Sequence, residues 1–321
     1  FGQKRDTKNM QAKEIREIIR AAGIVGMGGA GFPTHVKLSP KSDRDIEYIL
    51  VNGAECEPYL TADYRLMLEE PEKLVGGLRI ILSMFENATG LICLEDNKPA
   101  AAAVLTELIK NDKKIQVVSL KTKYPQGSER KLIYAATGRK INASMLPSDV
   151  GCIVQNVDTV CSVYRAVAEG TPLIRRTVTV SGEAVKEPQN FNVRIGTSFA
   201  ELAEAAGGFA TEPTKLVSGG PMMGIAMYTL DVPVVKTSSG LIAFADDEVA
   251  ELEETPCIRC GRCVSVCPSR LVPKKMMEAA TRFDSSTYEA IGGMECYECG
   301  SCTYVCPAGK RLTQAFRQTK R

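Results

Sequence analysis

The sequence has 321 residues and a mass of 34.8 kDa, which suggests about two domains and permits a sizeable core without disulfides. Hydrophobic residues make up 44% and charged residues 24%, which excludes a disordered, collagen-like or coiled-coil protein. The formal net charge of +2 provides no field that would attract nucleic acid or an anionic membrane surface.

The first part of the chain alternates between helical and strand patterns. Apolar residues spaced i, i+3, i+4 and i+7 predict an amphipathic helix over 10–22, which Gly23 ends before a glycine-rich segment at 26–33. Such alternation predicts a parallel α/β sheet. The expected strands are 45–52, 90–94 and 115–120, and the expected helices are 69–87, 99–111, 128–137 and 156–169.

The pattern changes after Pro172. Alternating segments at 176–182 and 192–195, a short helix at 199–206 and two glycine-marked segments at 215–227 and 234–244 predict a small mixed β domain. An acidic connector at 246–254 then leads into a cysteine-rich segment, where a helix is expected at 272–283.

The cysteine-rich segment contains an internal repeat. Each copy reads C-x-x-C-x-x-C-x-x-x-C-P, and the second copy is displaced by 39 residues from the first. This spacing is that of the bacterial ferredoxin run, in which three cysteines wrap one [4Fe–4S] cube and the fourth reaches the other cube. We therefore predict one cluster on Cys257, Cys260, Cys263 and Cys306, and a second on Cys296, Cys299, Cys302 and Cys267.

Structural zinc is the alternative for these eight cysteines, since C-x-x-C pairs are common zinc ligands, but three evenly spaced cysteines followed by Cys-Pro fit zinc poorly. Close spacing in a chain too large to need disulfides indicates metal binding and a reducing cytosol. The other cysteines, Cys56, Cys93, Cys152 and Cys161, are scattered and are expected to be buried structural thiols.

No apolar run is long enough to span a membrane, and no signal peptide is recognisable. The sequence begins with Phe1 rather than Met, so we expect an N-terminal portion to be missing.

The glycine-rich segment matches the pattern Gly26-x-Gly28-x-x-Gly31 of dinucleotide-binding loops. A helix precedes it, however, where a Rossmann unit has a strand, and Pro33 follows too soon for the usual start of a helix. The loop is therefore either a plain tight turn or a nest of backbone N–H groups that approaches a flavin or phosphate closely.

Several longer motifs resemble a known family. The segments 28–34 (GGAGFPT) and 52–58 (NGAECEP) are similar to the FMN- and NADH-binding subunit of respiratory complex I. The likeness to the C subunit of the Rnf (Rsx) electron-transport complex is closer. It extends over 53–63 (GAECEPYLTAD), 124–129 (YPQGSE), 155–159 (QNVDT), 217–224 (VSGGPMMG) and the double cysteine run.

The resemblance implies three domains. They are a Rossmann-like α/β FMN/NADH-binding domain at 1–172, a small β-grasp-like SLBB domain at 173–246 and a mainly α-helical 2[4Fe–4S] ferredoxin-type domain at 247–321. The SLBB domain is expected to pack between the other two without chemistry of its own. An N-terminal hammerhead domain of that family is not in this chain.

The resemblance also implies residue roles. The FMN-binding residues would be Gly26, Gly28, Gly29, Gly31, Lys37, Asn52, Glu55, Gly127, Asn156 and Thr159. Phe32 would stack on the adenine of NADH, and Glu57 and Glu129 would bind its hydroxyl or amide groups. Asn52 and Asn156 are alternatively turn or helix-cap residues. The chain departs from complex I at Ala54 and Cys56, where that family has Asp and Gly, and lacks an Arg near the glycine loop.

The function implied is the electron-input subunit of a membrane-bound NADH:ferredoxin oxidoreductase that is coupled to Na⁺ or H⁺ transport. NADH would reduce FMN, and two [4Fe–4S] clusters would pass single electrons to an iron–sulfur partner subunit, with ferredoxin acting at the level of the complex. The chain would lie peripherally on the cytoplasmic side of the membrane. The alternatives are a soluble paralogue serving a cobalamin reductase or a proline reductase, and a non-catalytic ferredoxin-type relay.

Overall fold

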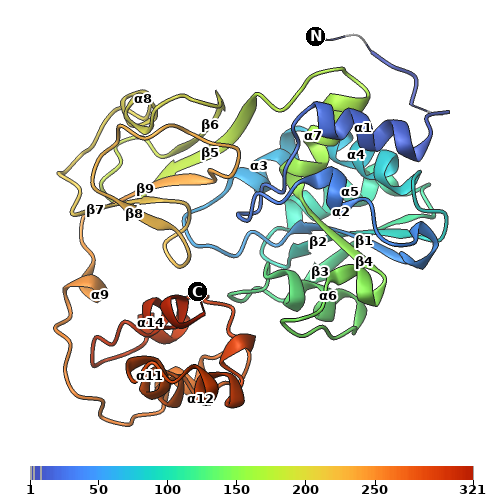
Figure 1. Cartoon of the computed structure of the whole chain (residues 1–321). Helices are drawn as coiled ribbons and strands as arrows, with labels where there is room; N and C mark the ends of the chain where they lie inside the picture. The colour runs from blue at the N-terminus through green and yellow to red at the C-terminus, as the bar shows by residue number, and fades with distance from the viewer. Residues whose placement is uncertain (1, 3, 8, 321) are drawn as a thin grey trace.

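The computed structural model describes residues 2, 4–7 and 9–320. It contains an N-terminal α/β domain, a central β domain and a small C-terminal helical domain that lies below the other two in the view of Figure 1. We keep the proposed boundaries near residues 172 and 246, because both fall between secondary-structure elements.

The N-terminal domain is built on a four-stranded parallel sheet, as the strand–helix alternation predicts. The strand order is β3-β2-β1-β4. The strands are β1 (Tyr48–Gly53), β2 (Thr89–Glu95), β3 (Ile115–Leu120) and β4 (Cys152–Asn156). From β1 the chain winds outward through β2 and β3 and then returns to the other side of β1, so the topological switch point lies between β1 and β4.

Helices cover both faces of this sheet. On one face Ile49, Val51 and Ile92 pack against α1, α4, α5 and α7, and on the other Leu50 and Cys93 pack against α6. Burial on both faces explains the continuous apolar runs of the strands. The helices are α1 (Ala12–Ala21), α2 (Thr34–Lys37), α3 (Ala62–Glu69), α4 (Pro71–Leu82), α5 (Pro99–Ile109), α6 (Glu129–Thr137) and α7 (Val157–Val167).

The prediction of one helix over 69–87 was wrong at both ends. Helix α3 ends at Glu69, and α4 begins at Pro71, whose ring fits the first helical position but not a helix interior. Gly77 allows helix α4 to pack closely on α7, since a Cβ at this position would lie only 2.1 Å from the carbonyl oxygen of Val160.

The central domain is a five-stranded mixed sheet of order β6-β5-β9-β7-β8. Its first and last strands in chain order, β5 and β9, pair in parallel near the centre of the sheet. This order is that of a β-grasp fold, and α8 packs Phe199 and Leu202 on the sheet. The elements are β5 (Arg175–Ser181), β6 (Gln189–Arg194), α8 (Phe199–Ala205), β7 (Lys215–Ser218), β8 (Ile225–Met227) and β9 (Gly240–Phe244).

The C-terminal domain consists of short helices around the two cysteine runs. Equivalent one-turn helices, α10 and α13, follow Gly261 and Gly300 in the two repeats, and both glycines have positive φ. A small core of Met276, Tyr288 and Phe316 joins the longer helices. The helices are α9 (Glu248–Glu251), α10 (Arg262–Ser265), α11 (Pro273–Thr281), α12 (Ser285–Ala290), α13 (Ser301–Tyr304) and α14 (Leu312–Thr319). Among the residues that the structure describes, no helix has the length and apolar character needed to cross a bilayer.

Candidate functional site

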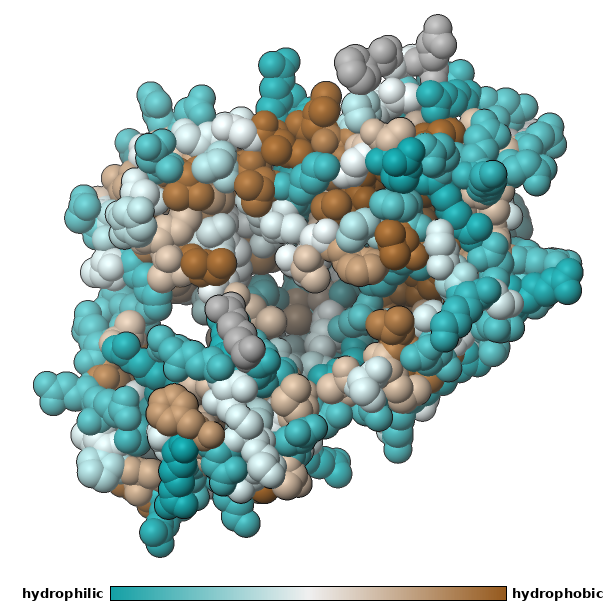
Figure 2. All heavy atoms as spheres, in the orientation of Figure 1, coloured by the Kyte–Doolittle hydropathy of each residue, from teal (hydrophilic) through white to brown (hydrophobic). Residues whose placement is uncertain are grey.

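The polar residues of the N-terminal domain gather at the switch point of its sheet. Asn52 and Asn156 are register partners at the carboxyl ends of β1 and β4. In open α/β sheets ligands bind outside the carboxyl ends of the strands at such a point. Five residues of this edge are half-buried and therefore partly accessible: Asn52, Glu55, Glu57, Gly127 and Asn156. Figure 2 shows a hollow in the middle of the molecule, where the upper domains face the C-terminal one.

Asn52 and Asn156 both have structural partners. The side-chain amide of Asn52 donates to the carbonyl oxygen of Gly127 at 2.8 Å, and its oxygen accepts from the backbone N–H of Ala54 at 3.2 Å. Asn156 is the N-cap of α7, where its oxygen accepts from the N–H groups of Asp158 and Thr159. Its amide donates to Asp63 at 2.6 Å. The turn and cap roles left open by the sequence are therefore present in the structure.

The glycine loop lies directly over the end of β4. Gly29 and Gly31 adopt φ values of 122° and 66°, which side-chain-bearing residues rarely do. The loop closes on itself through hydrogen bonds from Gly26 N–H to Phe32 and from Gly31 N–H to Gly26. A Cβ on Gly28 would lie 3.6 Å from the Cβ of Asn156, so the loop backbone comes down to the switch point.

Thr159 supports this loop from behind. Its side chain is fully buried, and its hydroxyl accepts from the backbone N–H of Met27 at 3.0 Å and donates to the carbonyl oxygen of Val25 at 3.4 Å. The structure therefore places Thr159 as a support of the loop backbone.

The two glutamates of the segment after β1 point to different neighbours. Glu55 accepts from the backbone N–H groups of Asp63 and Tyr64 in the first turn of α3, at 3.0 and 3.1 Å. Glu57 accepts from the N–H of Met222 in the central domain at 3.0 Å. Burial raises the pKa of both carboxyls, because the charged form loses solvation.

Between these glutamates, Cys56 is half-buried rather than part of the core. Its sulfur accepts from the N–H of Gly127 at 3.3 Å, and burial raises the pKa of its thiol to about 11. A Cβ on Gly127 would lie 2.2 Å from the carbonyl oxygen of Ala54, so only glycine fits there. Cys93, Cys152 and Cys161 are buried, as expected of structural thiols.

The remaining predicted residues lie along the rim. Phe32 is 51% exposed, so its ring is free to receive a planar ligand. Lys37 and Glu129 form an ion pair with an Nζ–Oε1 distance of 2.5 Å, which joins α2 to the start of α6. The predicted FMN and NADH residues thus come from four separate segments that meet at one edge of the sheet.

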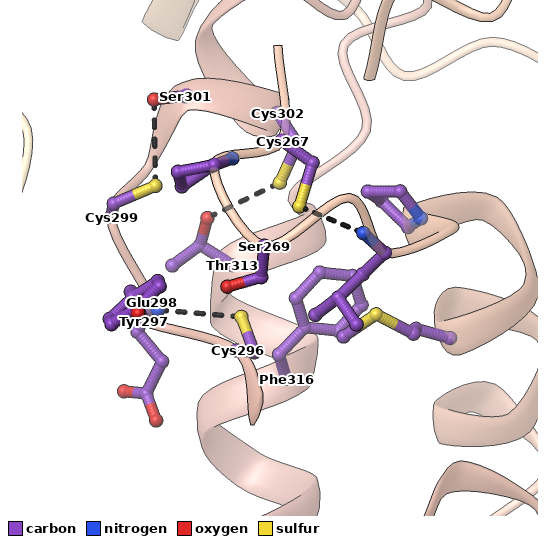
Figure 3. A pocket seen from close by; sticks show the side chains of 14 residues that line it. Cys267, Ser269, Cys296, Tyr297, Glu298, Cys299, Ser301, Cys302, Thr313 and Phe316 are labelled. Atoms are coloured by element: carbon purple, nitrogen blue, oxygen red, sulfur yellow. Dashed lines mark hydrogen bonds between the residues drawn. The ribbon is translucent and has the colours of Figure 1, made fainter. Parts of the chain in front are cut away.

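Four of the eight clustered cysteines come together in space. Cys267, Cys296, Cys299 and Cys302 line one pocket, and Figure 3 shows their sulfurs around a common space. The pKa of Cys302 is raised to about 12, mainly by burial; a hydrogen bond with Thr313 opposes this shift, and the neighbouring Cys296, Cys299 and Cys267 contribute to it. Burial also raises the pKa of Cys263, to which Cys306 and Cys257 add. This grouping crosses the two repeats.

The chemistry of this set of four cysteines fits an iron–sulfur cluster. The N–H groups of Leu271 and Glu298 donate to the sulfurs of Cys267 and Cys296, both at 3.3 Å (Figure 3), and such N–H···S bonds stabilise and tune these clusters. The fully buried Tyr288 hydroxyl has no hydrogen-bond partner within the described residues. Burial raises its pKa, and the nearby Cys296 and Cys302 add to this shift. Among the described residues, no group of three or more His, Cys, Asp or Glu side chains lies close enough together to hold a metal ion directly.

The pocket with Cys299 lies against the N-terminal domain. The hydroxyl of Tyr124 is 2.7 Å from the carbonyl oxygen of Cys299 and 3.5 Å from Oε1 of Glu57. Helix α6 adds two contacts, because Lys131 donates to the carbonyl oxygen of Pro268 at 2.6 Å and Arg130 pairs with Glu295. Cys257 and Cys260, which do not line this pocket, are exposed.

Three residues contribute to the site although the sequence predicts no role for them: Tyr124, Asp63 and Arg176. Tyr124 lies within a motif that carries the resemblance, but its contact with Cys299 spans 175 positions. Asp63 is the last residue of the resemblance motif 53–63, but the resemblance implies no role for it, and Arg176 carries no pattern that distinguishes it from a surface charge. Their partners, Asn156 and Asp158, became apparent only with the fold.

Three family models match successive parts of the chain. They are the Nuo51 FMN-binding domain at residues 19–165, the SLBB domain at residues 177–226 and the 4Fe-4S dicluster domain at residues 256–310. The cofactors expected from the sequence, FMN and two [4Fe–4S] clusters, are those of these domains. The glycine loop and the half-buried polar residues beside it fit an FMN site. The pocket lined by four cysteines fits a [4Fe–4S] cluster.

The fold is also found in a solved protein. The crystal structure of NAD⁺-reducing [NiFe]-hydrogenase in the H₂-reduced state matches 96% of this chain and 61% of that chain, with a TM-score of 0.67 and 19% identity. At this identity the match describes the architecture alone.

Relatives with higher identity cover most of the chain. The C subunit of the proton-translocating ferredoxin:NAD(+) oxidoreductase complex of Clostridium ljungdahlii is 49% identical over 85% of this chain and 59% of its own length. The C subunit of the Na(+)-translocating complex of Acetobacterium woodii is 44% identical over 98% of this chain and 71% of its own length. The C subunit of the ion-translocating oxidoreductase complex of Rhodobacter capsulatus is 44% identical over 98% and 60%.

The chain thus spans about three fifths to seven tenths of the length of these relatives. The 98% of this chain shared with the Acetobacterium woodii and Rhodobacter capsulatus relatives includes all three matched domains. The chain therefore belongs to the family of C subunits of the Rnf ion-translocating ferredoxin:NAD⁺ oxidoreductases, with an FMN-binding domain related to that of complex I.

Proposed function

We propose that the chain is the electron-input subunit of a membrane-bound NADH:ferredoxin oxidoreductase coupled to Na⁺ or H⁺ translocation. The names of its relatives support this role, since one is proton-translocating and another Na⁺-translocating. One structural observation carries it. Tyr124 joins the switch-point edge of the FMN-binding domain to Cys299 of a cysteine set, so a nucleotide site and a cluster site share a boundary.

FMN, when bound, accepts a hydride from NADH and releases its two electrons singly, whereas each cluster carries one electron. The residues that would hold FMN are Gly26, Gly28, Gly29, Gly31, Lys37, Asn52, Glu55, Gly127, Asn156 and Thr159. The loop glycines leave room for close approach of the cofactor, and Thr159 fixes the loop through Met27. The ion pair of Lys37 with Glu129 places a cation and an anion together at the rim.

NADH would be held by Phe32, Glu57 and Glu129. The exposed ring of Phe32 offers a stacking surface for the adenine. The Oε2 atom of Glu57 accepts a hydrogen bond from the N–H of Met222. The other oxygen, Oε1, lies next to the Tyr124 hydroxyl and would accept a hydrogen bond from the nucleotide.

The cysteines would hold the clusters in the crossed sets predicted from the spacing. Cys267, Cys296, Cys299 and Cys302 would form the site nearer to the FMN-binding domain. Cys257, Cys260, Cys263 and Cys306 would form the outer site, where the exposed thiols of Cys257 and Cys260 face away from the core. We infer that the outer site delivers electrons to an iron–sulfur partner subunit, with ferredoxin acting elsewhere in the complex.

We place the chain peripherally on the cytoplasmic side of the membrane. This position agrees with eight free clustered cysteines, which need a reducing compartment.

The test is a cofactor inventory followed by an assay. Anaerobic reconstitution should give one FMN and about eight iron atoms per chain, and the loaded protein should reduce ferricyanide with NADH. Both cofactors without NADH oxidation would favour a ferredoxin-type relay instead. Purification of the chain with membrane-embedded subunits separates this role from a soluble partner of cobalamin reductase or proline reductase, with which the chain would purify free of membrane.

A further inference from the structure

The central domain reaches into the glycine loop through one buried arginine. Arg176 lies on β5 and is 3% exposed. Its guanidinium donates twice to the carbonyl oxygen of Ser238 in its own domain, at 3.2 and 3.0 Å. The same group forms an ion pair with Asp158 of α7 and lies 3.3 Å from the sulfur of Met27. Arg176 therefore links the SLBB domain to the loop and to the helix behind it.

Met27 is consequently held at two points. Its backbone N–H is bound by the Thr159 hydroxyl, and its sulfur is contacted by Arg176. Asp158, which precedes Thr159, also accepts from Arg165 at 3.2 Å, so this carboxylate lies between two guanidinium groups. The loop, the start of α7 and the central domain thus form one hydrogen-bonded unit.

A turn of the central domain contacts the loop at two further positions. Residues 235–238 close through hydrogen bonds between Val235 and Ser238 in both directions. Within this turn, Lys236 donates to the carbonyl oxygen of Gly23 at 2.6 Å. The methyl group of Thr237 would lie 3.1 Å from a Cβ on Gly31. The turn therefore contacts the loop region at two points, Gly23 and Gly31.

The loop needs such outside support because of its composition. Four glycines within six residues give its backbone a wide choice of conformations, and every one that cannot bind FMN lowers the affinity. The loop supplies only two backbone hydrogen bonds of its own, from Gly26 and Gly31, among the described residues. Further contacts that fix its shape come from the buried Met27 side chain in the core of the N-terminal domain, from Thr159 and from the central domain.

We propose that the SLBB domain is a brace that holds the glycine loop in its FMN-binding conformation, with Arg176 and Lys236 as positioning residues. The domain then has a role in cofactor affinity and is more than a spacer. The proposal rests on the proposed function in one respect, namely that the loop lies under FMN.

The chain offers a matched pair of substitutions for the test. Arg175 and Arg176 are neighbours on β5, but Arg175 is exposed and bonds only to Asn192 of its own domain in the contacts described. FMN is titrated into full-length protein carrying its clusters, and the quenching of flavin fluorescence gives Kd. Arg176→Met should raise Kd at least tenfold, Arg175→Met less than twofold, and Arg176→Lys should restore part of the affinity.

Hydrogen exchange provides the second measurement. In the FMN-free protein, amides of residues 23–31 should exchange at least tenfold faster in Arg176→Met than in Arg175→Met, with unchanged cluster EPR spectra. Lys236→Met removes a partly buried hydrogen bond to Gly23 and leaves the buried ion pair of Arg176 intact, so it carries the test if Arg176→Met does not fold. Equal Kd values and equal exchange in the Arg176 and Arg175 variants, or in Lys236→Met and the unmodified protein, would overturn the brace.

These outcomes are separable from the proposed function. If the unmodified protein binds no FMN, the proposed function fails, while the exchange of residues 23–31 still decides whether the SLBB domain braces the loop. If the unmodified protein binds FMN and oxidises NADH but the variants behave alike, only the brace is overturned.

Discussion

The hydroxyl of Tyr124 donates a hydrogen bond of 2.7 Å to the carbonyl oxygen of Cys299, which joins the FMN-binding domain to the pocket lined by four cysteines. Tyr124→Phe removes this bond and leaves the carbonyl without its partner. The loss should lower the free energy of unfolding by about 1 kcal/mol. Urea unfolding of the reconstituted protein checks this, with the exposed Tyr134→Phe as control. Equal effects of both changes would mean that the contact does not stabilise the domain arrangement.

The crossed assignment of the cysteines makes a specific prediction for double substitutions. Cys267→Ala and Cys302→Ala should each remove the same cluster, so the double variant should retain about four of about eight iron atoms per chain. Cys267→Ala with Cys263→Ala should remove both clusters. Iron analysis and EPR of the reduced proteins distinguish these cases, with the buried Cys93→Ala as control. The reverse pattern would show that each repeat holds its own cluster.

Asp63 should make stability depend on pH. Burial raises its pKa well above the ordinary value of 3.8, the charges of Glu55 and Asp158 raise it further, and Arg176 and Asn156 oppose this. The folded state then holds the proton more tightly than the unfolded state, so the contribution of Asp63 to stability is fully present below pH 3.8 and is lost as the pH rises through the folded pKa.

Asp63→Asn removes this loss and can still accept the hydrogen bond from Asn156. We expect a shallower decline in the free energy of unfolding above pH 4, by at most about 1.4 kcal/mol per pH unit. Urea titrations at several pH values measure it, and the exposed Glu212→Gln serves as control. Parallel pH profiles for Asp63→Asn and the unmodified protein would contradict a buried, protonated Asp63.

Phe32 should affect nucleotide binding more than the chemical step. Its ring is 51% exposed at the rim of the site, so Phe32→Ala removes a stacking surface without opening the core. We expect KM for NADH to rise about threefold to tenfold with little change in kcat. Steady-state assays with ferricyanide measure both constants. Phe283→Ala, at a 91% exposed position of the C-terminal domain, should change neither, and a fall in kcat alone for Phe32→Ala would refute the assignment.

Local spacing determined what could be expected from the sequence. The positions of Cys257 to Cys267 and of Cys296 to Cys306 specify a cluster-binding run, because the ligands of one cube come mainly from a single short turn. Strand–helix alternation likewise predicts the parallel sheet, since each βαβ unit requires a crossover. The helix expected over 69–87 is present as α4 but is shorter at both ends; it begins at Pro71, whose ring fits the first helical position and not a helix interior.

Only the tertiary structure decided which residues share a boundary. The contacts of Tyr124 with Cys299 and of Arg176 with Met27 join positions 175 and 149 residues apart. Such partners depend on how three domains pack, and no periodicity or motif encodes them. The sequence by itself therefore determined the local chemistry of each cofactor site. Packing decided which site adjoins which and which domain supports the glycine loop, because these contacts join residues that are far apart in the chain and belong to different domains.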